Sequence, residues 1–206
     1  MPSRGGYYSF DLGDWHLIAL NSQLCKGTTW NPVLGQGVQV TRSASISKGC
    51  GPGTPMYEWL KRDLVLHPNR QYPCTLAYWH HPLFGTEPHP QGVFLLQLQP
   101  IWELLDEHGV DVVLSGHDHN YQRFAPQDAF GRGGSGRDPR SSSWGPGETR
   151  TETCRRANRR PNLEAAHDAS FGVLRMTLEP GTYDFEFVTA EGERAFSDAG
   201  EEVACR

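Results

Sequence analysis

The sequence predicts an α/β fold organised around a parallel sheet. Residues 74–79 and 110–114 are short apolar runs, which are typical of buried strands. Between them, residues 94–108 carry apolar side chains at helical spacing, Pro100 must lie in the first turn of that helix or kink it, and Gly109 ends it. A strand, a helix and a second strand in this order form a parallel βαβ unit, so both strands end at the same edge of the sheet.

Length and composition exclude several classes of protein. The chain has 206 residues, of which 37% are hydrophobic and 21% charged, values that suit one folded domain rather than a disordered chain. The net charge of -5 and the absence of a long apolar run lead us to expect neither a nucleic-acid partner nor a membrane partner. The chain enters strand-like sequence soon after Met1, so we expect no signal peptide in it. The oligomeric state stays open.

The first elements form a β-hairpin. Residues 7–11 and 15–21 are strand-like runs on either side of a Gly13-Asp14 turn. Gly-Asp pairs also occur in metal sites, but here the pair suits a tight turn for conformational reasons. We expect His16 to face outward from the second strand.

A long loop and a helix come next. Cys25 and Cys50 flank the Gly-rich part of residues 22–53, and a disulfide between them would close this loop. With five cysteines in the chain, at least one thiol lacks a partner here. Thr54 and Pro55 are typical of the N-cap and first residue of a helix. His67 follows that helix, where an imidazole favours a dipole contact over a metal.

Both buried strands end in histidines. His80 and His81 follow residues 74–79, and His117 and His119 follow residues 110–114 after a Ser-Gly turn. Because parallel strands share their carboxyl edge, these imidazoles should gather at one place. Imidazole suits Zn, Fe and Mn, so the sequence predicts a metal site at this edge.

The second half of the chain changes character. Residues 129–160 contain eight Arg, no Lys and three acidic residues, without apolar periodicity, and we expect a disordered loop there. A local reading-frame error would produce the same abrupt change. Residues 171–178 and 183–188 alternate and predict an antiparallel hairpin, followed by a mostly polar tail.

The histidine motifs resemble those of a known family. Trp-His-His-Pro at residues 79–82 and Gly-His-Asp-His-Asn-Tyr-Gln-Arg at residues 116–123 are similar to motifs of the calcineurin-like metallophosphoesterases, nearest to a secreted bacterial branch akin to purple acid phosphatases. The resemblance covers most of residues 7–128 and 161–205. It implies a β-sandwich flanked by helices in a four-layer α/β/β/α arrangement, and a secreted or extracytoplasmic parent protein.

The resemblance also implies roles for individual residues. It implies a phosphatase with two metal ions (Fe, Zn or Mn) and a phosphorylated small-molecule substrate. His80 and His117 would bind one ion and His119 the other, while His89 would be a general acid or a hydrogen-bond donor to the phosphate, or else an ordinary loop histidine. His81 would contact the metal ligands rather than the metal itself. The remaining candidates receive structural or surface roles: Tyr121 and Arg123 beside the loop, and His108 and His167 on the surface.

The chain departs from the family pattern. The family's Asp, its bridging Gly-Asp and its Gly-Asn-His motif have no counterpart, so residues 1–206 resemble a single partial domain whose N-terminal half is missing. Two main hypotheses follow. The first is a phosphoric ester hydrolase that activates water with two metals. The second is a truncated, catalytically inactive fragment that binds one metal or none. A third hypothesis is a binding module that uses the histidine edge to contact a partner.

Overall fold

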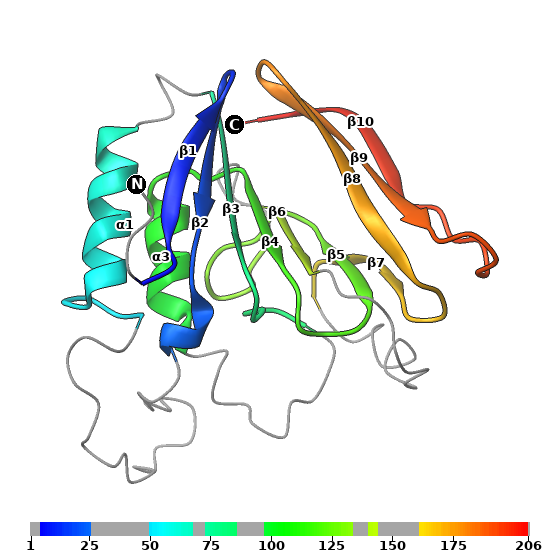
Figure 1. Cartoon of the computed structure of the whole chain (residues 1–206), viewed down its shortest axis with the longest axis horizontal. Coiled ribbons are helices and arrows are strands. Elements are labelled where there is room, and N and C mark those ends of the chain that lie inside the picture. The colour runs from blue at the N-terminus through cyan, green and yellow to red at the C-terminus, as the bar shows by residue number, and fades with distance from the viewer. Residues whose placement is uncertain are drawn as a thin grey trace, which may run out of the picture.

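The computed structural model describes residues 5–25, 50–67, 73–85, 97–133, 140–143 and 161–205. An antiparallel hairpin is followed by alternating helices and strands and then by a three-stranded meander (Figure 1). In chain order the elements are β1 (Tyr8–Leu12), β2 (Trp15–Ala19), the 3-10 helix η1 (Ser22–Cys25), α1 (Pro55–Leu66), β3 (Cys74–Trp79), α3 (Gln99–Glu107), β4 (Val112–Ser115), β5 (Tyr121–Phe124), β6 (Arg140–Ser143), β7 (Leu163–His167), β8 (Gly172–Glu179), β9 (Thr182–Thr189) and β10 (Ala199–Ala204).

The larger sheet contains the predicted βαβ unit. Its strand order is β1-β2-β3-β4-β6-β5-β7. The β1–β2 hairpin is antiparallel, as predicted, and Gly13 adopts a left-handed φ of 59° at its turn. Strands β2, β3 and β4 are parallel, and α3 connects β3 to β4. The helix has proline in its first turn and ends before Gly109, whose φ is 70°. Three parallel strands therefore end at one edge.

Both faces of the larger sheet are covered. Helices α1 and α3 lie on one face, and the three-stranded sheet β10-β9-β8 lies on the other (Figure 1). The core under the helices includes Ile18, Met56, Leu60, Ala77, Ile101, Trp102 and Leu105. The core between the sheets consists of Trp15, Cys74, Leu76, Val112, Tyr183 and Phe185. This α/β/β sandwich confirms the predicted fold class, and the described residues supply three of its four expected layers.

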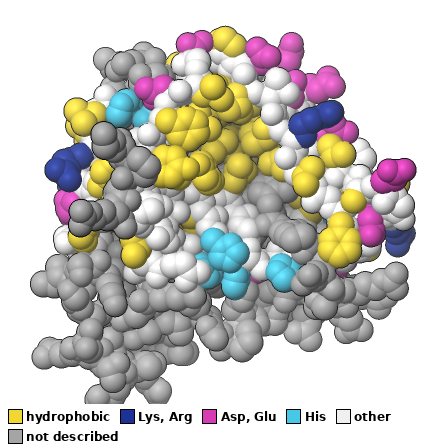
Figure 2. Space-filling view, viewed as in Figure 1, with side chains coloured by type: hydrophobic (Ala, Val, Ile, Leu, Met, Phe, Trp, Pro, Cys, Tyr) yellow, Lys and Arg dark blue, Asp and Glu magenta, His cyan; other side chains and the backbone are white. Residues whose placement is uncertain are grey.

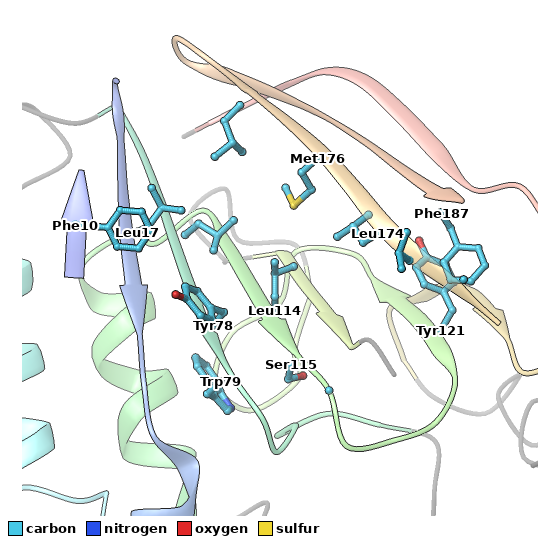
Figure 3. A pocket seen from close by; sticks show the side chains of 15 residues that line it. Phe10, Leu17, Tyr78, Trp79, Leu114, Ser115, Tyr121, Leu174, Met176 and Phe187 are labelled. Atoms are coloured by element: carbon cyan, nitrogen blue, oxygen red, sulfur yellow. The ribbon is translucent and has the colours of Figure 1, made fainter. Parts of the chain in front are cut away.

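An apolar cleft of about 680 Å³ lies between the two sheets and is open to solvent. Leu17, Tyr78 and Leu114 line it from the larger sheet, and Leu174 and Met176 face them from β8 (Figure 3). In the space-filling view, hydrophobic side chains form a broad patch in this region (Figure 2). An apolar surface of this kind is uncommon on a soluble monomer.

Two disulfides link a loop and the C-terminal tail to the rest of the fold. Cys25–Cys50 confirms the predicted bridge, with its Cα atoms 5.0 Å apart. Cys74–Cys205 was not predicted, and it links the start of β3 to the residue after β10 across a separation of 131 residues. The fifth cysteine, Cys154, lies outside the described residues. The second bridge fastens the smaller sheet to the larger one.

His16 corrects one prediction. The side chain was expected to face outward, but it is only 1% exposed. The hairpin pattern suggested a sheet with one solvated face, whereas α1 covers the face of β2 that carries His16. Burial lowers the pKa of this imidazole, but hydrogen bonds to Asp63 and Asp11 and the charges of both carboxylates outweigh it and raise the pKa above its ordinary value.

The stretch 129–160 differs in part from the expected loop. Arg140–Ser143 form β6, which pairs with β4 in parallel and with β5 antiparallel. Ala129 is buried, and Gly133 bridges to Gln127. Residues 134–139 and 144–160 lie outside the described residues, as do residues 94–96 of the predicted second helix.

The hairpin predicted at residues 171–178 and 183–188 is confirmed as β8 and β9. No strand was predicted in the mostly polar tail, which contributes β10 beside β9. Within the described residues, none of the helices combines the length and apolar character needed to cross a bilayer.

Candidate metal centre

Strand register brings two of the predicted ligands together. Trp79 of β3 pairs with Ser115 of β4, so the residues that follow lie side by side. The pairing continues past the strands, where the Gly116 N–H donates to the His80 carbonyl at 2.9 Å. His80 and His117 therefore meet at the carboxyl edge of the sheet, as predicted. Figure 2 shows histidine side chains gathered along this lower edge.

Three imidazoles converge at this edge. His80, His81 and His117 each offer one ring nitrogen, and these atoms all lie within 4.8 Å of one another. The Nε2 of His80 is 3.1 Å from the Nδ1 of His117. His80 and His117 are exposed and His81 is buried. We call these three residues the edge cluster.

His81, which was predicted to support the metal ligands, lies beside His80 and His117 in the edge cluster. Its Nδ1 lies 2.8 Å from the Oγ of Ser22, and the same oxygen accepts the His81 backbone N–H at 3.1 Å. The Trp79 indole N–H donates to the His81 carbonyl at 2.6 Å. These bonds fix the ring of His81 toward the other two. Sequence reasoning missed Ser22, although its position just after β2, at the same edge, is a usable signal.

His117 sits on a strained backbone. Its φ is 73°, in the left-handed region that non-glycine residues rarely adopt. Exposure then alternates along the loop: His117 and His119 are exposed, while Asp118 and Asn120 are buried. Both histidines are therefore accessible from solvent. Strain of this kind collects at functional sites.

The structure does not bring every predicted residue into the edge cluster. His119 is exposed but is not among the three imidazoles that converge. His89 lies outside the described residues. Asp118 has only 3% of its surface exposed, and a Cβ on Gly85 would lie 2.6 Å from its Oδ2. This carboxylate is thus packed against the neighbouring loop.

Two residues after the histidine loop join the sheets. The Arg123 guanidinium binds Asp198 through two hydrogen bonds of 2.7 and 2.9 Å, and the Tyr121 hydroxyl donates to the same carboxylate. Burial alone would raise the pKa of Asp198, but the hydrogen bonds from Arg123 and Tyr121 outweigh it and lower the pKa. Both side chains therefore have the structural role predicted for them.

The two histidines predicted at the surface also have structural partners. His108 follows α3, and its Nδ1 lies 2.9 Å from the Leu104 carbonyl. His167 is half-buried rather than at the surface, because its ring stacks on Phe196 at 4.2 Å. Burial lowers the pKa of His167.

The donor set suits a transition metal. Three imidazoles whose ligand atoms lie within 4.8 Å of one another match the preference of Zn and similar ions. A two-metal site also needs a carboxylate between the ions, and the edge cluster contains none among the described residues. The residues of the edge cluster therefore fit one ion.

Comparison with known families agrees with this chemistry. The model of the calcineurin-like phosphoesterase family matches residues 6–121, which is more than half of the chain and includes the edge cluster. The chain belongs to the calcineurin-like phosphoesterase family. It is 28% identical over 152 residues to an acid phosphatase of Aspergillus ficuum, a match that covers 63% of this chain and 24% of the relative.

Solved structures share the fold of this chain. A purple acid phosphatase from yellow lupin (Lupinus luteus) seeds superposes with a TM-score of 0.64 at 15% identity, covering 97% of this chain and 34% of that one. A dimetal phosphatase from Danio rerio superposes with a TM-score of 0.56 at 12% identity, covering 98% of this chain and 61% of that one. The chain thus spans about a quarter of the fungal relative and about a third of the lupin structure.

Proposed function

We propose that this chain forms part of a metal-dependent phosphatase that hydrolyses phosphate esters of small molecules. The observation that carries the proposal is the convergence of His80, His81 and His117 at the carboxyl edge of three parallel strands. His80 and His117 hold one ion, and His119, which is exposed as His117 is, reaches the second. An acid phosphatase among its relatives and a dimetal phosphatase with the same fold support this assignment.

The chain's own residues position these ligands. Ser22 orients the ring of His81, and the hydrogen bond from Gly116 to the His80 carbonyl keeps the two histidine-bearing loops together. The exposed rings of His80 and His117 leave the site open to a phosphate group. When bound, the ions supply an activated water and neutralise charge on the phosphoryl group. His89 remains the predicted proton donor or phosphate contact.

A second candidate is a fragment that binds one metal or none and does not turn over substrate. It is favoured by the all-imidazole edge cluster, since without a bridging carboxylate both affinity and water activation should be poor. On this basis we expect the isolated 206-residue chain to have little or no phosphatase activity.

Metal counting separates the two candidates. The purified chain and the double variant His80→Ala/His117→Ala would be equilibrated with Zn²⁺ or Mn²⁺, and bound metal and p-nitrophenyl phosphate hydrolysis measured on both. If the variant binds two equivalents of metal fewer than the unmodified chain, the enzyme is supported. If it binds at most one equivalent fewer, the inactive fragment is supported. His108→Ala, which changes a histidine outside the edge cluster, is the control. Turnover by the chain alone at the rate of a complete phosphatase would overturn the expected inactivity.

We also infer that the chain works in an oxidising compartment, outside the cytoplasm. The two disulfides support this, because such bonds persist mainly in secreted and extracytoplasmic proteins. Counting free thiols in protein purified from its native source tests the inference. Four reduced cysteines at these positions would contradict it.

A further inference from the structure

A second group of potential metal ligands lies at the other end of the sheet. Asp11 of β1, His16 of β2 and His67 at the end of α1 each offer one ligand atom, and these atoms all lie within 4.8 Å of one another. We call these three residues the hairpin cluster. His16 pairs with Thr75, five residues before His80 along β3, so the two clusters are about 16 Å apart.

Hydrogen bonds define which nitrogens bear protons. The Nδ1 of His67 lies 2.9 Å from the Asp63 backbone carbonyl, which can only accept, so Nδ1 carries a proton and Nε2 is the nitrogen that would bind an ion. The Nε2 of His16 lies 2.9 Å from the Asp63 carboxylate, while its Nδ1 faces the Asp11 carboxylate at 2.7 Å. An ion would therefore bind His16 through Nδ1.

Asp63 occupies the supporting position found in metal sites. Histidine ligands commonly donate their second N–H to a carboxylate, which sets the tautomer and the direction of the ring. Asp63 accepts this bond from His16, and its other oxygen accepts a hydrogen bond of 2.7 Å from the Ser9 hydroxyl. The carboxylate that orients His16 is therefore itself held in place.

The hairpin cluster combines stacked rings with access from solvent. The rings of His16 and His67 stack at 4.2 Å with an interplanar angle of 15°, so one ring turns out of the stack when both rings bind one ion. The side chain of His16 is 1% exposed, but those of Asp11 and His67 are 41% and 28% exposed. An ion can therefore reach the ligands from solvent without opening the fold.

We propose that Asp11, His16 and His67 form a second metal site, for Zn²⁺ or another divalent ion that prefers imidazole, with Asp63 orienting His16. Two imidazoles and one carboxylate are a common Zn²⁺ ligand set, and water completes the coordination. The ion takes the place of the proton between His16 and Asp11. It ties the β1–β2 hairpin to the end of α1, so its role is structural.

The test uses the full chain carrying His80→Ala/His117→Ala, which removes the edge cluster from the metal count. Zn²⁺ binding by titration calorimetry and Co²⁺ absorption in the visible range would be measured. We expect one equivalent of Zn²⁺ and ligand-field bands from Co²⁺, and a higher Tm with Zn²⁺. Adding His67→Gln should abolish all three, and Asp63→Asn should weaken Zn²⁺ binding by about 10–100-fold.

Matched controls separate metal binding from general structural effects. His108 caps α3 through the same Nδ1-to-carbonyl bond as His67, but it is not part of the hairpin cluster, so His108→Gln should leave binding unchanged. Asp14→Asn removes an exposed carboxylate from the same hairpin turn and should also be silent. A folded double variant that binds no Zn²⁺, or binding retained after His67→Gln, overturns the proposal. Neither result bears on the edge cluster, which this background lacks.

Discussion

His117 has a left-handed backbone conformation, and its imidazole belongs to the edge cluster. Substitution can separate the effect of the backbone from the effect of the imidazole. At φ 73° an alanine is strained as a histidine is, whereas glycine is not. We expect His117→Gly to be more stable than His117→Ala by about 1 kcal/mol, although both lack the imidazole. Urea unfolding of the two variants measures the difference. Equal stability would mean that the backbone at this position is not strained in solution.

Asp198 gives the fold a defined acid sensitivity. Because its pKa is lowered in the folded state, its ionised form contributes stability above the unfolded pKa of about 3.9, and this contribution is lost as the pH falls through the folded pKa. We expect Asp198→Asn to cost about 1–3 kcal/mol near pH 7, with the deficit shrinking below about pH 4. Urea unfolding across this pH range is the measurement.

The exposed Asp14→Asn substitution removes one carboxylate without touching Arg123 or Tyr121, and it serves as the control. A deficit in Asp198→Asn that stays constant down to pH 3 would show that the carboxylate acts through packing rather than charge.

Sequence reasoning located the histidine edge but not all of its contacts. His80 and His117 were predictable because each follows an apolar strand of a βαβ unit. His81 was expected at the same edge, but its hydrogen bond with Ser22 was not predictable, because Ser22 follows a neighbouring strand. His16 was predicted to be exposed but is buried. Nothing in its own strand reveals that α1, which carries Asp63, covers it.

Among the elements, the Cys74–Cys205 bridge should dominate stability. Closing a loop across 131 residues restricts the unfolded chain more than the 25-residue separation of Cys25 and Cys50 does. We expect Cys205→Ser to cost about 4–5 kcal/mol and Cys50→Ser about 3 kcal/mol. Urea unfolding without reductant gives both values. The reverse order would indicate that the tail stays docked without its bridge.

The elements that sequence patterns missed are the short or polar ones. Strands β5, β7 and β10 have four to six residues and mixed polarity, and they depend on pairing with strands far along the chain. By contrast, β3 and β8 were predictable from their own apolar run or alternation. The bridge to Cys205 was also beyond reach, because cysteine connectivity does not follow from spacing.

At the scale of the whole molecule, the apolar cleft between the sheets is the most exposed part of the core. We expect the folded chain to bind the dye ANS there, with near-UV circular dichroism still showing fixed tertiary structure. Phe10 is 43% exposed and lines the cleft, so Phe10→Lys should reduce ANS fluorescence and concentration-dependent self-association.

Phe130 provides the matched control for this experiment. It is 63% exposed but does not line the cleft, so Phe130→Lys adds the same charge at an exposed phenylalanine elsewhere. If both substitutions lower ANS fluorescence equally, the dye reports general surface hydrophobicity. If only Phe10→Lys does, the cleft is the site. Absence of ANS binding by the unmodified chain would mean that the cleft is buried in solution, either because the two sheets close on each other or because two copies of the chain associate through it.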